Sequence, residues 1–164
     1  MLAARYFDGK ALTLFWCDKP WHLCSPTDVQ SRDVGSASDG PWFSVSVHDL
    51  NGDGVDDVLA TTNRNDGLGA VYGFEVPSDA RTGTWTSHRL GPAGFAPHFR
   101  LPGQGGPGTA TAFRLNMGAP ERKAMVLVSG DDNATVCMLT AFVPGDPTNW
   151  DYRLVRLLTS SKGT

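Results

Sequence analysis

The sequence lacks long hydrophobic runs and a strong excess of charge of one sign, and each absence excludes a class of protein. None of its 164 residues falls in an apolar stretch of about 20, so we expect no transmembrane helix. The formal net charge is only −3, and a chain without a basic field is a poor candidate for nucleic-acid binding. Charges interrupt the apolar segment that an N-terminal signal peptide would need.

Cysteine is scarce as well, and the three that occur leave two interpretations open. Cys17 and Cys24 are close enough in sequence to form a disulfide in an oxidising compartment, which would leave Cys137 over. Alternatively all three are buried free thiols that act as small apolar residues, and this is the interpretation we favour. Asn133 begins an Asn-Ala-Thr glycosylation sequon, whose use the sequence does not decide.

No segment of about 12 residues keeps a helical apolar period without a glycine or proline break. The chain instead contains 19 glycines, 11 prolines and many β-branched residues, a composition typical of short strands joined by turns. We therefore predict an all-β protein. The expected strands cover residues 12–16, 29–34, 42–50, 58–62, 70–76, 85–90, 109–115, 124–129 and 136–143.

The most informative stretch is residues 47–59, VHDLNGDGVDDVL, in which oxygen-bearing side chains stand at every second position. Crowded aspartates repel one another unless a cation lies among them, and Ca²⁺ prefers carboxylate, amide and carbonyl oxygens. The glycines between them supply the backbone conformations of a tight loop. The predicted Ca²⁺ ligands are Asp49, Asn51, Asp53, the carbonyl of Val55, and Asp57.

The spacing of this loop is open to two other interpretations. An EF-hand loop starts with the same spacing but needs a glutamate at its twelfth position, where this chain has Ala60. A metal-free hairpin is also possible, since Asn51-Gly52 between alternating apolar runs is a turn signal by itself. A plain hairpin does not call for three aspartates, and like charges across the strands would weaken it.

Residues 49–59, DLNGDGVDDVL, resemble the calcium loop of FG-GAP repeats, also called VCBS-type repeats. Such repeats build the β-propeller of integrin α-subunit heads and of many secreted microbial and fungal proteins. The resemblance implies a structural Ca²⁺ between the inner strands of a blade. Phe43-Ser44 departs from the Phe-Gly pair of the family, and residues 60–62 replace its Gly-Ala-Pro segment. Partner binding of the integrin type therefore does not follow from the resemblance.

The pattern of strands and turns repeats with a period of about 65 residues, which is typical of propeller blades of four antiparallel strands. We predict an all-β, FG-GAP and integrin-α-like partial β-propeller of about two and a half blades. The predicted units are a half blade of two strands at residues 1–35, the calcium-binding blade at 36–91 and a degenerate blade at 108–158. Two and a half blades do not close into a ring, so further blades or other chains would be needed.

The second full unit does not keep the loop. Only Asn116 remains as a candidate ligand there, and Arg122 and Lys123 bring positive charge to the end where Asp57 stood. We expect a single Ca²⁺ per chain.

Few other residues indicate chemistry. Trp85 and Trp150 recur at equivalent positions of the repeat, which favours packing between blades over a sugar-stacking surface. The long connection between the two full units lies where propellers often carry function, and we predict a binding surface there. Its residues are Phe95, His98, Phe99 and Arg100.

These observations predict a calcium-binding propeller module that acts as a scaffold or binding module for a protein or glycan ligand. No serine elbow and no histidine–carboxylate cluster are recognisable, so we expect no enzyme activity in this chain. The start in mid-blade favours a fragment of a longer secreted or extracellular protein. The alternatives are a lectin-like, carbohydrate-binding propeller and the non-catalytic portion of a propeller-bearing carbohydrate-active enzyme.

Overall fold

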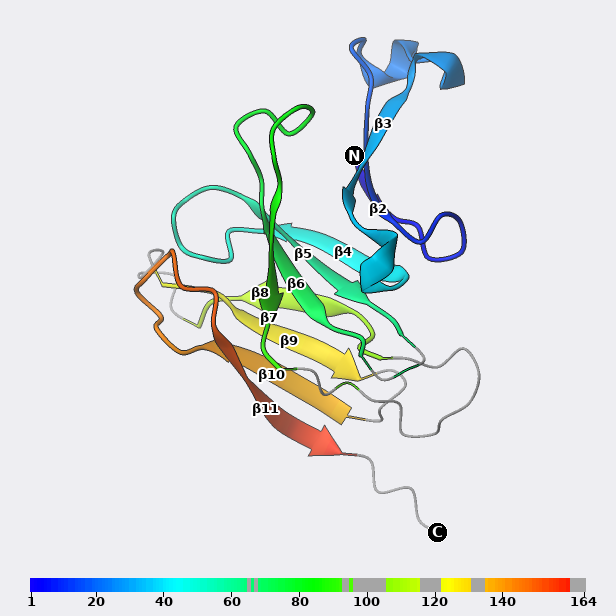
Figure 1. The fold of residues 1–164 in the computed structure, drawn as a ribbon. Helices are drawn as coiled ribbons and strands as arrows, with labels where there is room; N and C mark the ends of the chain where they lie inside the picture. Colours follow the sequence, from blue (N-terminus) through cyan, green and yellow to red (C-terminus); the bar gives the residue numbers. More distant parts are fainter. Residues whose placement is uncertain are drawn as a thin grey trace.

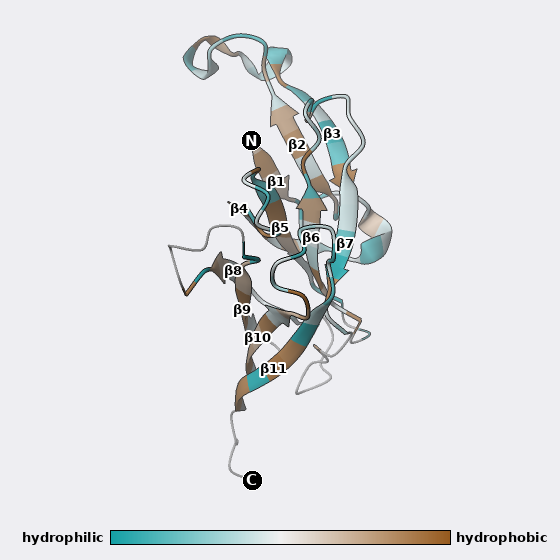
Figure 2. Ribbon diagram, turned by 90° about the vertical axis from the view of Figure 1, so that its left-hand side faces the viewer, coloured by the Kyte–Doolittle hydropathy of each residue, from teal (hydrophilic) through white to brown (hydrophobic). Residues whose placement is uncertain are grey.

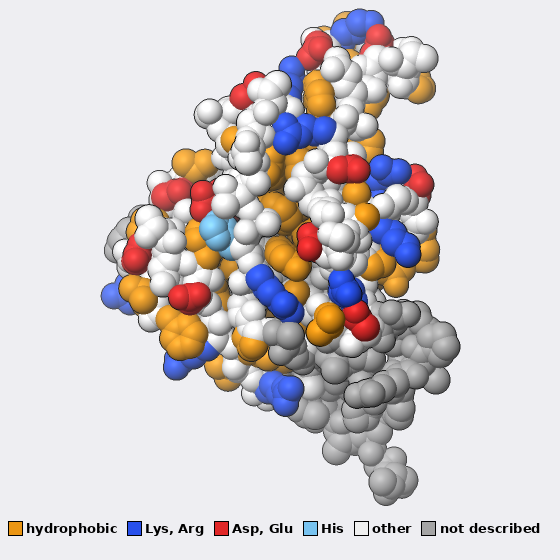
Figure 3. Space-filling model, viewed as in Figure 1, with side chains coloured by type: hydrophobic (Ala, Val, Ile, Leu, Met, Phe, Trp, Pro, Cys, Tyr) orange, Lys and Arg blue, Asp and Glu red, His pale blue; other side chains and the backbone are white. Residues whose placement is uncertain are grey.

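The computed structural model describes residues 1–64, 66, 68–92, 95, 106–115, 122–130 and 135–159. Its regular structure is β-strand, apart from three 3₁₀ turns: η1 (Trp21–Leu23), η2 (Pro26–Asp28) and η3 (Ala37–Asp39). No helix in this part of the chain has the length and apolar character needed to cross a membrane. Figure 3 shows acidic and basic side chains interspersed over one face, in keeping with the small net charge.

Within the described residues, eleven strands form three antiparallel sheets, in each of which the spatial order follows the sequence (Figure 1). The first sheet contains β1 (Leu2–Ala4), β2 (Leu12–Trp16) and β3 (Gln30–Gly35). The second contains β4 (Trp42–His48), β5 (Asp57–Thr62), β6 (Val71–Glu75) and β7 (Thr86–Leu90). The third contains β8 (Ala110–Phe113), β9 (Met125–Gly130), β10 (Thr135–Ala141) and β11 (Tyr152–Thr159).

The predicted all-β partial propeller is confirmed: two four-stranded antiparallel sheets and one three-stranded sheet pack on one another, and the described strands do not close into a ring. One detail was wrong. The first sheet has three strands instead of two, because β1 pairs with β2 from Leu2 opposite Leu14 to Ala4 opposite Leu12.

The second sheet lies between the other two and is covered on both faces. Side chains alternate between the faces of a strand, so Val58 and Ala60 of β5 pack toward the first sheet and Leu59 toward the third. All six residues of β5 are consequently buried. Figure 2 shows the hydropathy of the strands: β1, β2 and β5 are largely hydrophobic, whereas β3 and β7, the last strands of the first two sheets, are largely hydrophilic.

Trp150 closes the seam between the second and third sheets, as its place in the repeat predicted. It is 8% exposed, and its ring stacks on His88 of β7 with 4.3 Å between the ring centroids. Gly73 of β6 makes room for it, because a Cβ atom there would lie 2.6 Å from the indole. Trp85 packs edge-on against Phe74 in the core between the first two sheets. The prediction that these tryptophans serve packing is confirmed.

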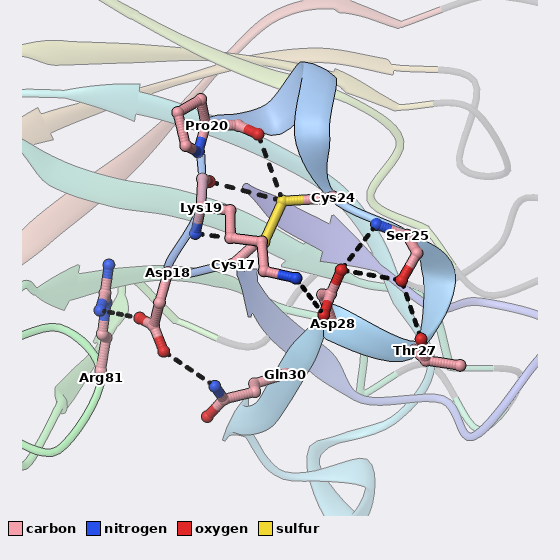
Figure 4. The surroundings of a disulfide bond; sticks show 10 residues. All are labelled: Cys17, Asp18, Lys19, Pro20, Cys24, Ser25, Thr27, Asp28, Gln30 and Arg81. Carbon is pink, nitrogen blue, oxygen red and sulfur yellow. Dashed lines mark hydrogen bonds and ion pairs between the residues drawn. A yellow bond between two sulfur atoms is a disulfide. The ribbon is translucent and has the colours of Figure 1, made fainter.

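A disulfide joins Cys17 to Cys24 in the loop between β2 and β3 (Figure 4). The favoured interpretation of three free thiols was therefore wrong for this pair, which the sequence spacing alone did not decide. Cys137 is free and buried. Beside the disulfide, Asp18 accepts a hydrogen bond of 2.6 Å from Arg81, which ties this loop to the connection between β6 and β7.

Candidate metal site

The predicted calcium loop connects β4 to β5 in the second sheet. The two strands pair up to His48 opposite Asp57, and the chain then turns through residues 49–56. Gly52 and Gly54 adopt φ angles of +83° and +86°, a left-handed conformation that side chains with a Cβ rarely adopt. These two glycines allow the backbone to coil tightly enough for side chains at alternate positions to fold back over the loop.

The polar side chains of the loop accept hydrogen bonds from its own backbone. Asp49 Oδ1 accepts from Gly52 N at 2.8 Å, Asn51 Oδ1 from Asp53 N at 3.0 Å, and Asp53 Oδ1 from Val55 N at 2.8 Å. Such turns hold the oxygen of each side chain over the loop. Each oxygen has a second lone pair, so these bonds leave acceptor capacity for a cation.

Asp57 lies at the base of the loop and is only 2% exposed. Its Oδ2 accepts hydrogen bonds from Leu50 N at 2.9 Å and Asn51 N at 3.4 Å. Burial raises the pKa of Asp57 to about 6, and the negative charges of Asp53 and Asp49 act in the same direction, while the two N–H donors lower it. A buried carboxylate with acidic neighbours is a group that a nearby cation would stabilise.

The side chains do not form a ready-made cage. Among the described residues, no three His, Cys, Asp or Glu side chains lie together in an arrangement that could hold a metal ion. The predicted set includes an amide and a backbone carbonyl besides its three carboxylates. Its donors are all oxygens, which fit a hard cation such as Ca²⁺.

Arg114, which follows β8 in the third sheet, supplies a positive charge that the sequence reasoning missed. Its guanidinium lies 3.1 Å from Asp49 Oδ2 and donates to the Asp49 carbonyl, while its Nε donates to the Arg122 carbonyl at 2.7 Å. Arg114 is 65 residues from Asp49 in the sequence. No local pattern indicates that pairing, which depends on how the two sheets stack.

The next residue of the loop, Leu50, is also bound by the third sheet. Its carbonyl accepts a hydrogen bond of 2.9 Å from Ala124 N. The buried hydroxyl of Tyr152 lies 3.3 Å from the same carbonyl and 3.2 Å from the Ala124 carbonyl. Burial raises the pKa of Tyr152, which keeps the hydroxyl protonated as a donor. The third sheet thus fixes the start of the loop even though the predicted metal ligands all belong to the second.

The second predicted site is contradicted at the one position that is described. Phe95 is fully buried in the core between the second and third sheets, so its assignment to an exposed binding surface was wrong. A Gly/Pro-rich connection suggested exposure, but the large apolar side chain of Phe95 packs inward. His98, Phe99 and Arg100 lie outside the described residues, as does Asn116 of the loop in the third sheet.

The raised pKa of Asp57 predicts an unusual pH dependence of the free energy of unfolding, measured in the presence of a chelator. Its pKa is about 6 in the folded protein against 3.8 as the ordinary value, so the folded state binds the proton more tightly. The stabilising effect of Asp57 is therefore complete below pH 4 and is lost as the pH rises through 6. We expect a loss of about 1.4 kcal/mol of unfolding free energy between pH 5 and 7.5.

The comparison with Asp57→Asn isolates this effect in urea unfolding at both pH values. It is needed because His48, whose pKa is lowered by burial, contributes with the opposite sign in the same range. An equal change with pH in both proteins would show that Asp57 is not the group responsible.

Comparison with known families gives one match. Residues 41–74 match the FG-GAP repeat family. The match spans β4, the predicted metal loop, β5 and most of β6. Comparisons with curated proteins and with solved structures give no match.

Proposed function

We propose that this chain, which carries an FG-GAP repeat at residues 41–74, is a calcium-stabilised propeller module whose task is binding or scaffolding and not catalysis. The repeat itself indicates a propeller-type structural or binding module. The calcium is our addition, and one observation supports it above the others. A buried carboxylate, Asp57, lies at the base of a loop in which the three other predicted side-chain ligands are held over the backbone by turns.

In this proposal Asp49, Asn51, Asp53, the Val55 carbonyl and Asp57 hold the ion. A divalent cation would cancel the repulsion among the three carboxylates and offset the cost of burying Asp57. Its role would be structural, because it would fix the hairpin between β4 and β5 against the third sheet. The setting we propose is extracellular, within a longer propeller that presents a surface to a protein or glycan.

Calcium titration by calorimetry tests the proposal directly. Protein freed of divalent ions should bind one Ca²⁺ per chain, and Asp53→Asn should weaken that binding at least tenfold because a charged ligand is lost. Asp56→Asn is the matched control: Asp56 is exposed in the same loop and outside the ligand set, and this substitution also removes one negative charge. Absence of heat in the wild type, or equal weakening in both variants, would rule out the site.

A further inference from the structure

We propose that the third sheet carries a binding site for a tetrahedral oxyanion, a sulfate or phosphate group, in a cavity of about 300 Å³ whose wall shares only Arg114 with the contacts of the metal loop. The cavity lies at one end of the sheet, where β8 ends, β9 begins, β10 ends and β11 begins. Its polar wall contains four cationic side chains and the hydroxyl of Thr140. The four cations are Arg114, Arg122, Lys123 and Arg153.

The cations differ in how far their hydrogen-bonding capacity is already used. Arg114 is engaged with Asp49 and with the Arg122 carbonyl. Arg153 stands opposite Thr140 in the β10–β11 ladder and donates its Nε to the Thr140 hydroxyl at 2.9 Å. That bond orients the guanidinium, and no ion pair to its terminal nitrogens occurs among the described residues.

Lys123 is the observation that points to a ligand. Its side chain lines the cavity and is only 6% exposed, and its buried Nζ has no hydrogen-bond partner in the described part of the chain. Burial lowers the pKa of Lys123, while the negative charges of Asp146 and Asp151 act in the opposite direction. Among the described residues Lys123 forms no ion pair. A buried ammonium without a partner is costly, and natural proteins seldom retain one that has no counter-charge.

An anion in the cavity would supply that missing partner. Sulfate and phosphate offer several acceptor oxygens to converging arginine and lysine donors, and arginine matches such groups with paired hydrogen bonds. The remaining wall is apolar and includes Leu115, Met125, Ala141 and Pro144. The arrangement therefore fits an oxyanion carried by a larger molecule with an apolar part, such as a sulfated or phosphorylated sugar.

Thermal melts test the oxyanion site in the absence of calcium. A negative result would therefore count against this site and not against the proposed calcium site. Sodium sulfate and sodium phosphate at up to 10 mM are compared with sodium chloride at equal ionic strength in chelator. The wild-type midpoint should rise saturably with the oxyanions and not with chloride, because a ligand of the folded state raises its stability. Glucose 6-sulfate and glucose 6-phosphate then show which of the two groups is preferred.

Three variants make the test specific. Lys123→Met keeps the length of the side chain and removes its charge; Arg153→Gln removes a cation on β11. In both variants, the oxyanion concentration that gives half of the rise in melting midpoint should increase about tenfold. Arg156→Gln is the matched control, an exposed arginine on the same strand outside the cavity, and should respond as the wild type does.

Without anion, Lys123→Met should melt above the wild type, since it removes an unpartnered buried charge. The site is overturned by an equal response in all four proteins, which would be a general salt effect, or by no response in the wild type. A lower midpoint of Lys123→Met without anion would likewise overturn it, because the ammonium would then be stabilised by the protein itself.

Discussion

Replacing Trp150 by alanine is expected to lower the free energy of unfolding by about 4 kcal/mol, as removal of a large buried aromatic does. The ring is 8% exposed, stacks on His88 and fills the space that Gly73 leaves. Alanine would leave a cavity between the second and third sheets that neither backbone can close. Unfolding in urea followed by far-ultraviolet circular dichroism measures the loss without relying on tryptophan fluorescence.

Two further variants show whether the loss comes from the packing of Trp150 or from the removal of any tryptophan. Trp150→Phe should cost much less, about 1 kcal/mol, because it keeps an aromatic ring and removes an indole N–H that is buried without a partner in the described structure. Trp21→Ala removes the same atoms at a position that is 54% exposed and should be nearly neutral. A comparable loss for Trp21→Ala and Trp150→Ala would contradict the assignment of Trp150 to the seam.

Calcium is expected to raise the melting midpoint by about 5–10 °C over the value in chelator. A ligand at 100 times its dissociation constant adds about 2.7 kcal/mol to the stability of the state that binds it. In a domain of this size, each kcal/mol shifts the midpoint by about 2–4 °C. The measurement is a thermal melt at pH 7.5 with saturating Ca²⁺ and with excess chelator.

Asp57→Asn and the wild type should change places in the order of their melting midpoints between chelator and Ca²⁺. In chelator it should melt at or above the wild type, because it removes the buried charge whose pKa is raised to about 6. In Ca²⁺ it should melt below the wild type, because it removes a ligand. Asp56→Asn should follow the wild type in both buffers. A wild-type midpoint that is the same with Ca²⁺ and with chelator would contradict the stabilising role of the ion.

Much of the fold could be predicted from the sequence, because the residue patterns that specify the strands and turns of each sheet are local. Alternating apolar residues, turn glycines and the repeated Trp85 and Trp150 predicted four-stranded antiparallel units, and the two complete sheets have that form. The loop was also recognisable, because its oxygen donors and its left-handed Gly52 and Gly54 all lie within one short stretch. Neighbouring residues determine each of these features.

The features that were missed depend on contacts between distant segments. β1 has only three residues and becomes a strand by pairing with β2. Phe95 lies in a connection rich in glycine and proline, and its burial follows from the stacking of two sheets. Arg114 and Tyr152 reach the metal loop from 65 and 102 residues away. Pairings of that kind leave no periodic trace in a single sequence.

The order of strands within each sheet has a consequence for how the protein is made. Within a sheet every strand pairs with its neighbour along the chain, so each sheet can form as a ribbon soon after its last strand leaves the ribosome. Trp150, however, covers Gly73 and His88, which are synthesised much earlier. During synthesis, one face of the second sheet therefore stays uncovered until most of the chain exists, and this is the interval in which a nascent chain would most need a chaperone.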